Sequence, residues 1–320
     1  MTPSRLRTTD RGPDPGSLPA MPRDGETPVE ETAAASSAQQ WSRLDRAYAL
    51  YLDEHPDPPG GSLLAQTILT GASRRGLYPL IGLEPDARIL DLGTGFGPVV
   101  LELARLQPVR AVGVDLDAAV LRVATDLGAS LADWLAPGAQ VRFERAGAET
   151  LPFEDASFDL VTARLLFQHL SDPERVVREV SRVLRRGGSA FVFDVDDGFG
   201  VSYPPPSGAL AVLEAAFAAC QSGRGGDREV GRKLTTYFTG AGFTVGSIRL
   251  LAQAAHVASE AGDTSRSLTT ARLLAVRAEI VDRGVLTAHE FDTHLEQYSS
   301  EPPVARFRAE SQLAVVFTKP

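Results

Sequence analysis

Short apolar runs alternate with helical patterns through the middle of the chain. Five runs carry closely spaced Val, Ile, Leu, Phe or Ala, which is typical of buried strands. Between them, apolar residues recur every three or four positions, as on one face of a helix. Strands that alternate with helices in this way predict right-handed βαβ units and a parallel sheet. The five predicted strands are RILDLG (88–93), RAVGVD (110–115), QVRFER (140–145), FDLVTA (158–163) and SAFVFDV (189–195).

Two later runs extend this sheet. GFTVGSIRL (242–250) and QLAVVFT (312–318) supply a sixth and a seventh strand. We therefore expect an α/β fold with a Rossmann-like, doubly wound, seven-stranded sheet. The sheet should be mostly parallel, with an antiparallel last strand, and should carry helical lid elements.

The remaining segments suggest how the chain is organised. Residues 1–37 are rich in proline and poor in large apolar side chains, which predicts a disordered N-terminal tail. Residues 38–80 are predicted to form an N-terminal helical lid, and residues 81–320 the main domain. Lid insertions are expected at about 198–240 and 251–310, and the second could cover a pocket or form a dimer surface.

Composition narrows the class of protein. The 320-residue chain is 43% hydrophobic but has no run of about 18 apolar residues, the length that a membrane-spanning helix needs. Its first residues lack an apolar segment, so we expect no secretory signal. A single cysteine excludes a disulfide framework and a Cys-rich metal site. A net charge of -9, without a basic stripe, argues against nucleic-acid binding. We expect a cytoplasmic protein without nucleic-acid or membrane partners.

The first predicted strand runs into the glycine-rich segment DLGTGFGP (91–98). Glycines between a strand and a helix let the backbone approach a ligand closely at the carboxyl edge of an open sheet. The dinucleotide fingerprint has its third glycine where this chain has Pro98, which disfavours a nicotinamide-dependent oxidoreductase. Asp91, two residues before the first glycine, suits a ligand with an amino group. A tight turn without a ligand is the alternative.

A second acidic residue follows the next strand. Asp115 ends that strand, 22 residues after Gly93, where a carboxylate can accept both ribose hydroxyls of an adenosine. Leu116 would offer an apolar face to the adenine, and Asp117 is expected to cap the following helix. Asp115 alone could be a surface acid, but its spacing from the glycine segment favours an adenosine-containing ligand.

Four segments together resemble a known family: DLGTGFG, VGVDLD, GAETLPFEDASFDLV and LRRGGSAFVFD. They are similar to the class I S-adenosylmethionine-dependent methyltransferases, nearest to their ubiquinone/menaquinone and small-molecule branch, over about residues 85–195. The resemblance implies S-adenosylmethionine as cofactor and S-adenosylhomocysteine as product. It places the methionine end near the glycine segment, the ribose on Asp115 and the adenine beside Glu149. The expected cofactor-binding residues are Asp91, Gly93, Thr94, Gly95, Gly97, Asp115, Leu116, Gly147, Ala148, Glu149 and Arg164.

One position departs from the family pattern. The family usually has an acidic residue where this chain has Gly147. The adenine amino group would then be recognised by backbone, by water or by Glu149.

The segment after the fourth strand, RLLFQH (164–169), offers the candidate chemistry. His169 is the candidate catalytic base because imidazole titrates near neutrality, and a histidine without a role is the alternative. Arg164 could hold an acidic substrate or the main chain of the cofactor. Arg74 and Arg75 are expected on a solvated helix face, with pairing to the cofactor carboxylate as the alternative.

Two further groups invite a metal interpretation, but we expect no metal site. Asp194, Asp196 and Asp197 carry oxygens of the type that Mg²⁺ prefers, yet the fourth strand ends without the acid that metal-dependent relatives place there. One of these acids is expected to line the substrate pocket. His289 and His294 are five residues apart, which places them on different faces of a helix.

These features predict a methyltransferase that transfers a methyl group to O, N or C of a small-molecule acceptor in bacterial secondary metabolism. Two alternatives stay open. One is a protein of this fold that binds the cofactor but catalyses a cyclisation or isomerisation, and the other is a cofactor-sensing module. A homodimer is a possible assembly.

Overall fold

The computed structural model describes residues 43–55, 58, 60–257, 264–301 and 306–320. The predicted disordered tail over 1–37 lies outside the described residues. No helix in the part of the chain that the structure describes is long and apolar enough to cross a membrane.

Helices precede the sheet, within the segment predicted as a lid. Residues 43–54 are helical and are followed by three short elements. These are α2 (Gly61–Leu69), α3 (Gly71–Arg75) and the 3-10 helix η1 (Tyr78–Leu80). The buried Tyr48 donates a hydrogen bond from its hydroxyl to the carbonyl oxygen of Phe96 at 3.1 Å, which ties the first helix to the glycine segment.

All five predicted parallel strands are present, and they pair in the order β3-β2-β1-β4-β5. Helices connect most of them as crossovers, and right-handed crossovers change face where the strand order reverses, between β1 and β4. The strands are β1 (Arg88–Leu92), β2 (Arg110–Asp115), β3 (Gln140–Arg145), β4 (Phe158–Arg164) and β5 (Leu184–Val195), and the crossover helices are α4 (Pro98–Leu106), α5 (Ala118–Ser130) and α6 (Pro173–Val183).

An antiparallel part completes the sheet around β8 (Arg306–Thr318). The long strand β7 (Thr244–Val257) pairs along one edge of β8, and β5 pairs with residues 312–318 on the other. The short strand β6 (Val201–Tyr203) pairs farther along that second edge, with Ala309 to Phe307. The sheet therefore has eight strands instead of the expected seven, because three residues are too few to produce a readable apolar alternation.

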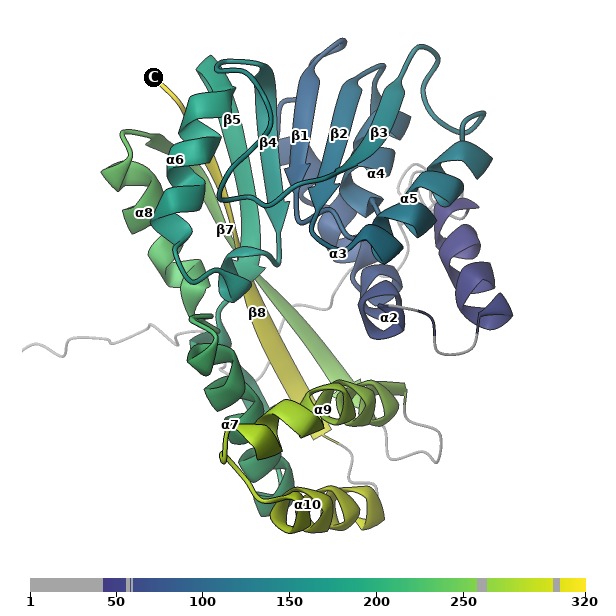
Figure 1. The fold of residues 1–320 in the computed structure, drawn as a ribbon, viewed down its shortest axis with the longest axis vertical. Helices are drawn as coiled ribbons and strands as arrows, with labels where there is room; N and C mark the ends of the chain where they lie inside the picture. The colour runs from purple at the N-terminus through teal and green to yellow at the C-terminus, as the bar shows by residue number, and fades with distance from the viewer. Residues whose placement is uncertain (1–42, 56–57, 59, 258–263, 302–305) are drawn as a thin grey trace, which may run out of the picture. The chain divides into compact units, whose positions relative to one another are not determined.

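The central sheet is covered on both faces (Figure 1). One face packs against α4 and the segment around η1, and the other against α6 and α8 (Leu234–Gly240). In α6, Val176, Val177, Val180 and Val183 recur at helical spacing, so all four lie in the core. Asp172 caps this helix through the amide of Arg175, as the Asp-Pro pair at its start predicts.

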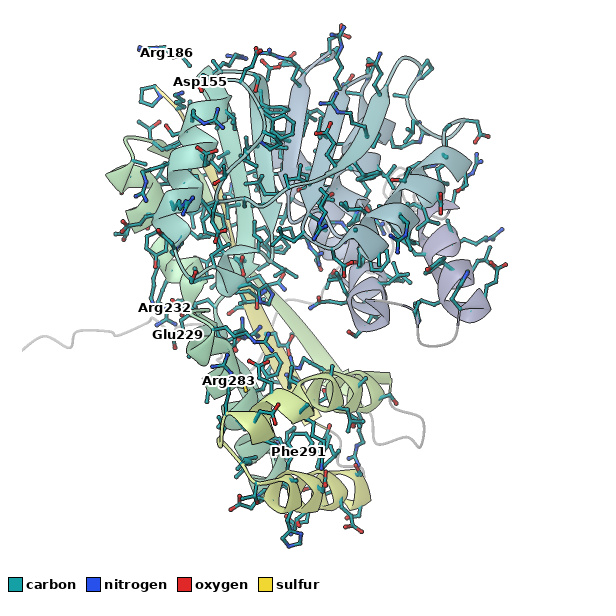
Figure 2. All side chains as sticks on the ribbon, in the orientation of Figure 1. Asp155, Arg186, Glu229, Arg232, Arg283 and Phe291 are labelled. Carbon is teal, nitrogen blue, oxygen red and sulfur yellow. The ribbon has the colours of Figure 1, made fainter. Side chains whose placement is uncertain are left out.

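A separate helical cluster lies beside the far ends of β7 and β8 (Figure 1). It consists of α7 (Gly208–Gly223), α9 (Thr264–Asp282) and α10 (Ala288–Ser300). Figure 2 shows Phe291 pointing into the middle of this cluster, where it is fully buried among side chains of all three helices. The two predicted insertions thus contribute to one apolar core, which is distinct from the two cores of the sheet.

Candidate active site

The carboxyl edge of the parallel strands is hollowed by a cavity of about 350 Å³, here called the glycine-loop cavity. This edge is where open α/β sheets bind their ligands. Most of the predicted cofactor-binding residues line it, and Gly97 and Gly147 do not. Those that do are Asp91, Gly93, Thr94, Gly95, Asp115, Leu116, Ala148, Glu149 and Arg164.

The glycine segment owes its shape to three left-handed residues. Gly93, Gly95 and Gly97 have φ values of +63°, +54° and +76°, which other residues rarely adopt. At Gly97 a Cβ atom would also lie 2.4 Å from the ring of Phe143. Gly97 therefore shapes the start of α4 and packs against β3, and its predicted role in binding is indirect.

Asp115 is held in place by the segment it faces. Its carboxylate accepts hydrogen bonds from the amide of Gly95 at 2.9 Å and from the amide of Asp117 at 3.0 Å. Each oxygen keeps a further lone pair for a ligand, since a carboxylate offers about four acceptor sites. Leu116 is 65% exposed beside it, which suits an apolar platform. Asp117 caps α5 through the amides of Ala119 and Val120, as predicted.

Asp91 supplies a buried negative group at the bottom of the glycine-loop cavity. Burial raises the pKa of its carboxyl to about 6, even though the Thr162 hydroxyl donates to it at 2.6 Å. A bound ammonium group would favour the charged carboxylate and lower this pKa. The position suits the amino group of an amino-acid ligand.

Arg164 is a buried cation with little to neutralise it. It donates one hydrogen bond, to the Thr70 hydroxyl at 2.5 Å, and its buried Nε has no partner among the described residues. Burial and the nearby positive charge of Arg74 lower the pKa of the guanidinium to about 10. Buried polar groups are normally paired, so this side chain is prepared for an anion such as a carboxylate.

The adenine end of the predicted site is more open. Ala148 and Glu149 line the glycine-loop cavity. Gly147 forms a bridge with Thr150, and a Cβ atom there would meet only Leu116, at 3.5 Å. The absence of an acidic side chain at this position is therefore not imposed by lack of space.

His169 lies on a short 3-10 helix, η2 (Phe167–His169), directly after β4. The chain turns there through Leu165, whose φ of +53° is unusual for a side-chain-bearing residue. The buried Asp194 on β5 accepts from the amide of Gln168 at 3.4 Å, and burial raises the pKa of Asp194 to about 7. Burial, followed by the charges of Arg228 and Arg224, lowers the pKa of His169. The imidazole is therefore neutral at pH 7 and can accept a proton.

A second cavity of about 470 Å³ adjoins the first at His169, which lines both. Strand β8, helices α7 and α9 and the segment after β5 form its walls. Of its residues, the sequence pointed to His169 and to one acid of the group that contains Asp197, whereas the others come from distant parts of the chain and were not identified. Its polar and aromatic lining includes Gln168, Asp197, Glu214, Phe217, Arg228, Arg272, Arg308 and Gln312.

Two arginines before the sheet do not reach either cavity. Arg74 is 1% exposed, and its Nε and terminal nitrogen each donate to Glu102 at 2.7 Å. Arg75 bonds Asp45 and the same Glu102. The expectation of a solvated face was wrong for Arg74 and for Arg75, whose side chain is 13% exposed, because their shared partner on α4 cannot be recognised from local sequence.

The three acidic residues considered for a metal site, Asp194, Asp196 and Asp197, lie in different environments. Asp194 and Asp196 are fully buried, and Asp196 pairs with Arg232. Asp197 lines the second cavity. The described residues contain no group of three His, Cys, Asp or Glu side chains that could hold a metal. In α10, Glu290 forms a capping box with Thr287 beside His289, which is exposed, whereas His294 is half-buried.

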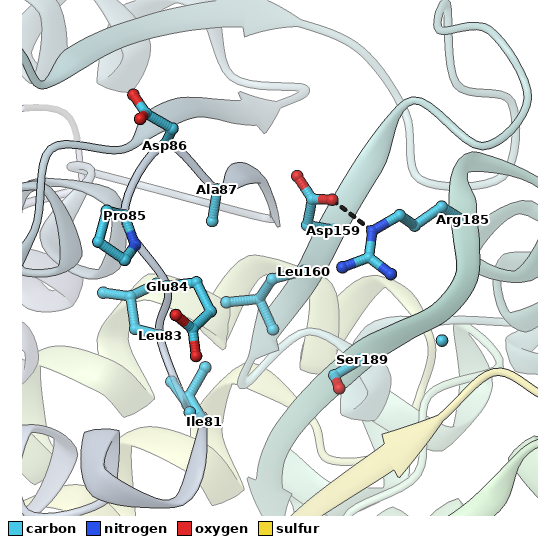
Figure 3. Close-up of a pocket in the computed structure, with 12 residues that line it drawn as sticks. Ile81, Leu83, Glu84, Pro85, Asp86, Ala87, Asp159, Leu160, Arg185 and Ser189 are labelled. Carbon is cyan, nitrogen blue, oxygen red and sulfur yellow. Dashed lines mark hydrogen bonds and ion pairs between the residues drawn. The ribbon is translucent and has the colours of Figure 1, made fainter.

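A third cavity, of about 450 Å³, lies at the opposite edge of the sheet (Figure 3). It is bordered by the 81–87 segment and by the amino ends of β4 and β5, where Asp159 pairs with Arg185. Arg88 also binds Asp159, so these charges satisfy one another. This edge lies away from the glycine segment and is a poor place for the chemistry.

Residues 90–192 match a family model described as a methyltransferase domain. A demethylmenaquinone methyltransferase from Thermus thermophilus is 34% identical over 159 residues, which are 48% of this chain and 66% of the relative. A 27-O-demethylrifamycin SV methyltransferase from Amycolatopsis mediterranei is 32% identical over 140 residues, 43% of this chain and 47% of the relative. The matched segments thus span between about half and two thirds of these relatives.

Solved structures share the fold. The YcgJ protein from Bacillus subtilis superposes with a TM-score of 0.51 at 21% identity, covering 78% of this chain and 98% of that one. The [4+2]-cyclase SpnF superposes with a TM-score of 0.50 at 20% identity, covering 78% and 80%. The family match, the motifs and the sheet with its antiparallel end agree, and residues 90–192 form a methyltransferase domain similar to those of the class I S-adenosylmethionine-dependent methyltransferases.

Proposed function

We propose that this protein transfers a methyl group from S-adenosylmethionine to a small-molecule acceptor. The observation that carries the proposal is that the glycine-loop cavity meets a second cavity at His169. Two adjoining cavities suit a reaction between two bound molecules, because holding both in position supplies much of the rate enhancement.

The residues of the glycine-loop cavity match the groups of the proposed cofactor one by one. Asp91 suits its ammonium group, Arg164 its carboxylate and Asp115 its ribose hydroxyls. Leu116 offers an apolar surface to the adenine. When bound, the cofactor supplies an activated methyl group on a sulfonium.

The protein itself would accept the proton that the acceptor loses. His169 is neutral at pH 7 and can take the proton that a hydroxyl or amine acceptor loses as it is methylated. Desolvation favours the neutral imidazole, and the positive charges of Arg228 and Arg224 act in the same direction by disfavouring a further cation. We extend the proposal to an acceptor from bacterial secondary metabolism, to a cytoplasmic location and to a homodimer, all of which stay predictions.

The first experiment is calorimetric titration with S-adenosylmethionine, S-adenosylhomocysteine and NADH. We expect micromolar binding of both adenosyl ligands, none of NADH, and a loss of at least about tenfold in Asp115→Ala, because hydrogen bonds to a charged group contribute about 1.5–3 kcal/mol. Asp117→Ala is the matched control, since that side chain caps α5 and does not line the glycine-loop cavity. Equal loss in both variants would contradict the assignment of Asp115.

The non-methylating alternative has its own signature. A cyclase or isomerase would form product as well with S-adenosylhomocysteine as with S-adenosylmethionine, whereas a methyltransferase would be inhibited by the former. A sensor would bind both ligands and turn over no acceptor. Mass spectrometry of candidate acceptors, scored for a gain of one methyl group, separates these outcomes.

A further inference from the structure

The second cavity contains an arginine that the rest of the protein leaves without a close anion. Arg272, on α9, lines this cavity, and its buried Nε has no hydrogen-bond partner among the described residues. The nearest carboxylate oxygen, on Glu214, is 4.0 Å from a terminal nitrogen of Arg272. This distance is beyond hydrogen-bonding range, so the guanidinium is only weakly compensated.

The other two arginines of the second cavity are already satisfied. Arg228 binds both carboxylate oxygens of Asp197 at 2.8 Å and also donates to Gln168. Arg308 contacts Glu310 at 2.5 Å. Arg308 also lies 3.7 Å from Glu214, so Arg272 is the arginine of the described cavity wall that has no carboxylate within hydrogen-bonding distance.

Aromatic packing holds Arg272 in position. Its guanidinium carbon is 4.9 Å from the ring centroid of Phe217, and that of Arg228 is 6.0 Å from the same ring. Burial and the positive charge of Arg228 lower the pKa of Arg272, and their effect exceeds the opposing effect of Glu214 and Glu310. A side chain packed in this way loses little entropy when it binds an anion.

A second unpaired group lies in the same wall. The buried Oε1 of Gln312, on β8, has no hydrogen-bond partner among the described residues. An amide oxygen only accepts hydrogen bonds, so a group that satisfies it must be a donor. One cavity thus presents an unpaired cation and an unpaired acceptor, although such buried groups are normally satisfied.

We propose that the second cavity binds its substrate through a carboxylate that pairs with Arg272, while a hydroxyl or N–H of the same molecule donates to Gln312. A guanidinium matches a carboxylate because two parallel N–H donors meet two oxygens. Leu210, Phe217 and Val195 provide apolar contacts for the body of the molecule. The inference rests on the proposed function in one respect, namely that this hydroxy acid is the methyl acceptor.

The test uses matched pairs of hydroxylated aromatic carboxylic acids and their primary amides, observed by saturation-transfer NMR with the protein saturated with S-adenosylhomocysteine. We expect each acid to bind at least about tenfold more tightly than its amide. A tenfold difference in Kd corresponds to about 1.4 kcal/mol of binding free energy. Arg272→Gln should abolish this preference, and Arg272→Lys should keep part of it. Arg277→Gln is the control on the same helix, because Arg277 pairs with Asp292 and does not line the second cavity.

Two results would overturn the inference. In one, no acid of the set binds more tightly than its amide to the unaltered protein. In the other, the preference for acids survives Arg272→Gln. Failure of the proposed function is distinguishable, because it appears in the separate S-adenosylhomocysteine titration, and the acid and amide pairs are then compared without that ligand.

Discussion

At the residue scale, the useful distinction is between charges that the protein satisfies and charges that it leaves for a ligand. Glu102 and Arg74 satisfy each other inside the core. Arg164 and Arg272 are half-buried, yet each keeps a buried Nε without a partner among the described residues and each lines a cavity. Because leaving a buried polar atom unpaired is costly, these two side chains support the anion sites that we propose.

His169 is expected to set the pH dependence of methyl transfer to a hydroxyl or amine. Its pKa is lowered below the usual 6.5, so it is neutral above that pH and gains a proton as the pH falls through its own pKa. The rate should therefore be level near pH 7 to 8 and decline below pH 6.5. His169→Gln should lower the rate by about 10²–10⁴-fold and remove this decline.

The measurement is the initial rate of methyl transfer between pH 5 and 8 for both proteins. Binding of S-adenosylhomocysteine at each pH serves as the control for loss of the cofactor site. An acid limb that is unchanged in His169→Gln would show that another group is the base.

At the element scale, a buried ionic network joins the N-terminal helices to the sheet. Glu102 on α4 accepts hydrogen bonds from Arg74 and Arg75 on α3 and from the hydroxyl of Tyr78 on η1. Helix α2, which contributes Leu63 and Thr67 to the glycine-loop cavity, is connected directly to α3. The network therefore anchors the element that forms one wall of that cavity.

Glu102→Ala should destabilise the fold by about 3–5 kcal/mol, because it leaves the guanidinium of Arg74 buried without a partner. Urea unfolding measures this loss. Asp292→Ala is the control, because its pair with Arg277 is exposed and should affect stability little. Similar losses in the two variants would show that the buried network does not anchor the helices.

Predictions were correct for elements that depend on neighbouring residues and wrong for those that depend on distant ones. The five parallel strands and the cap at Asp117 were predicted correctly, because each depends on residues close together in the chain. The short β6 was missed because its pairing with β8 joins segments about a hundred residues apart. The prediction of a solvated helix face for Arg74 was wrong for a similar reason, because its partner Glu102 lies on another helix.

At the scale of the whole molecule, the two cavities are built by different parts of the chain. The sheet and the N-terminal helices provide the glycine-loop cavity, whereas α7, α9 and β8 provide much of the second. The cluster of α7, α9 and α10 has its own apolar core around Phe291. Loss of that core should therefore affect the acceptor side more than the cofactor side.

Phe291→Ala should lower stability by about 3–5 kcal/mol, the usual cost of removing a buried aromatic ring. It should also weaken binding of acidic ligands while changing the affinity for S-adenosylhomocysteine less than about twofold. Urea unfolding and the two titrations measure these effects, with Leu274→Ala, an exposed change on α9, as the control. A matching loss in both titrations would mean that the cluster and the sheet act as one unit.

Sequence by itself determined the resemblance to methyltransferases, the five parallel strands and most of the residues that line the glycine-loop cavity. Glycines at a strand end, and acids at set distances from them, are local patterns whose geometry follows from one βαβ unit after another. The tertiary structure alone decided where the second cavity lies and how the charges in it are paired. Arg272, Gln312 and Phe217 come from segments far apart in the chain, and only packing shows that Arg228 and Arg308 each contact a carboxylate closely while Arg272 has one only at 4.0 Å.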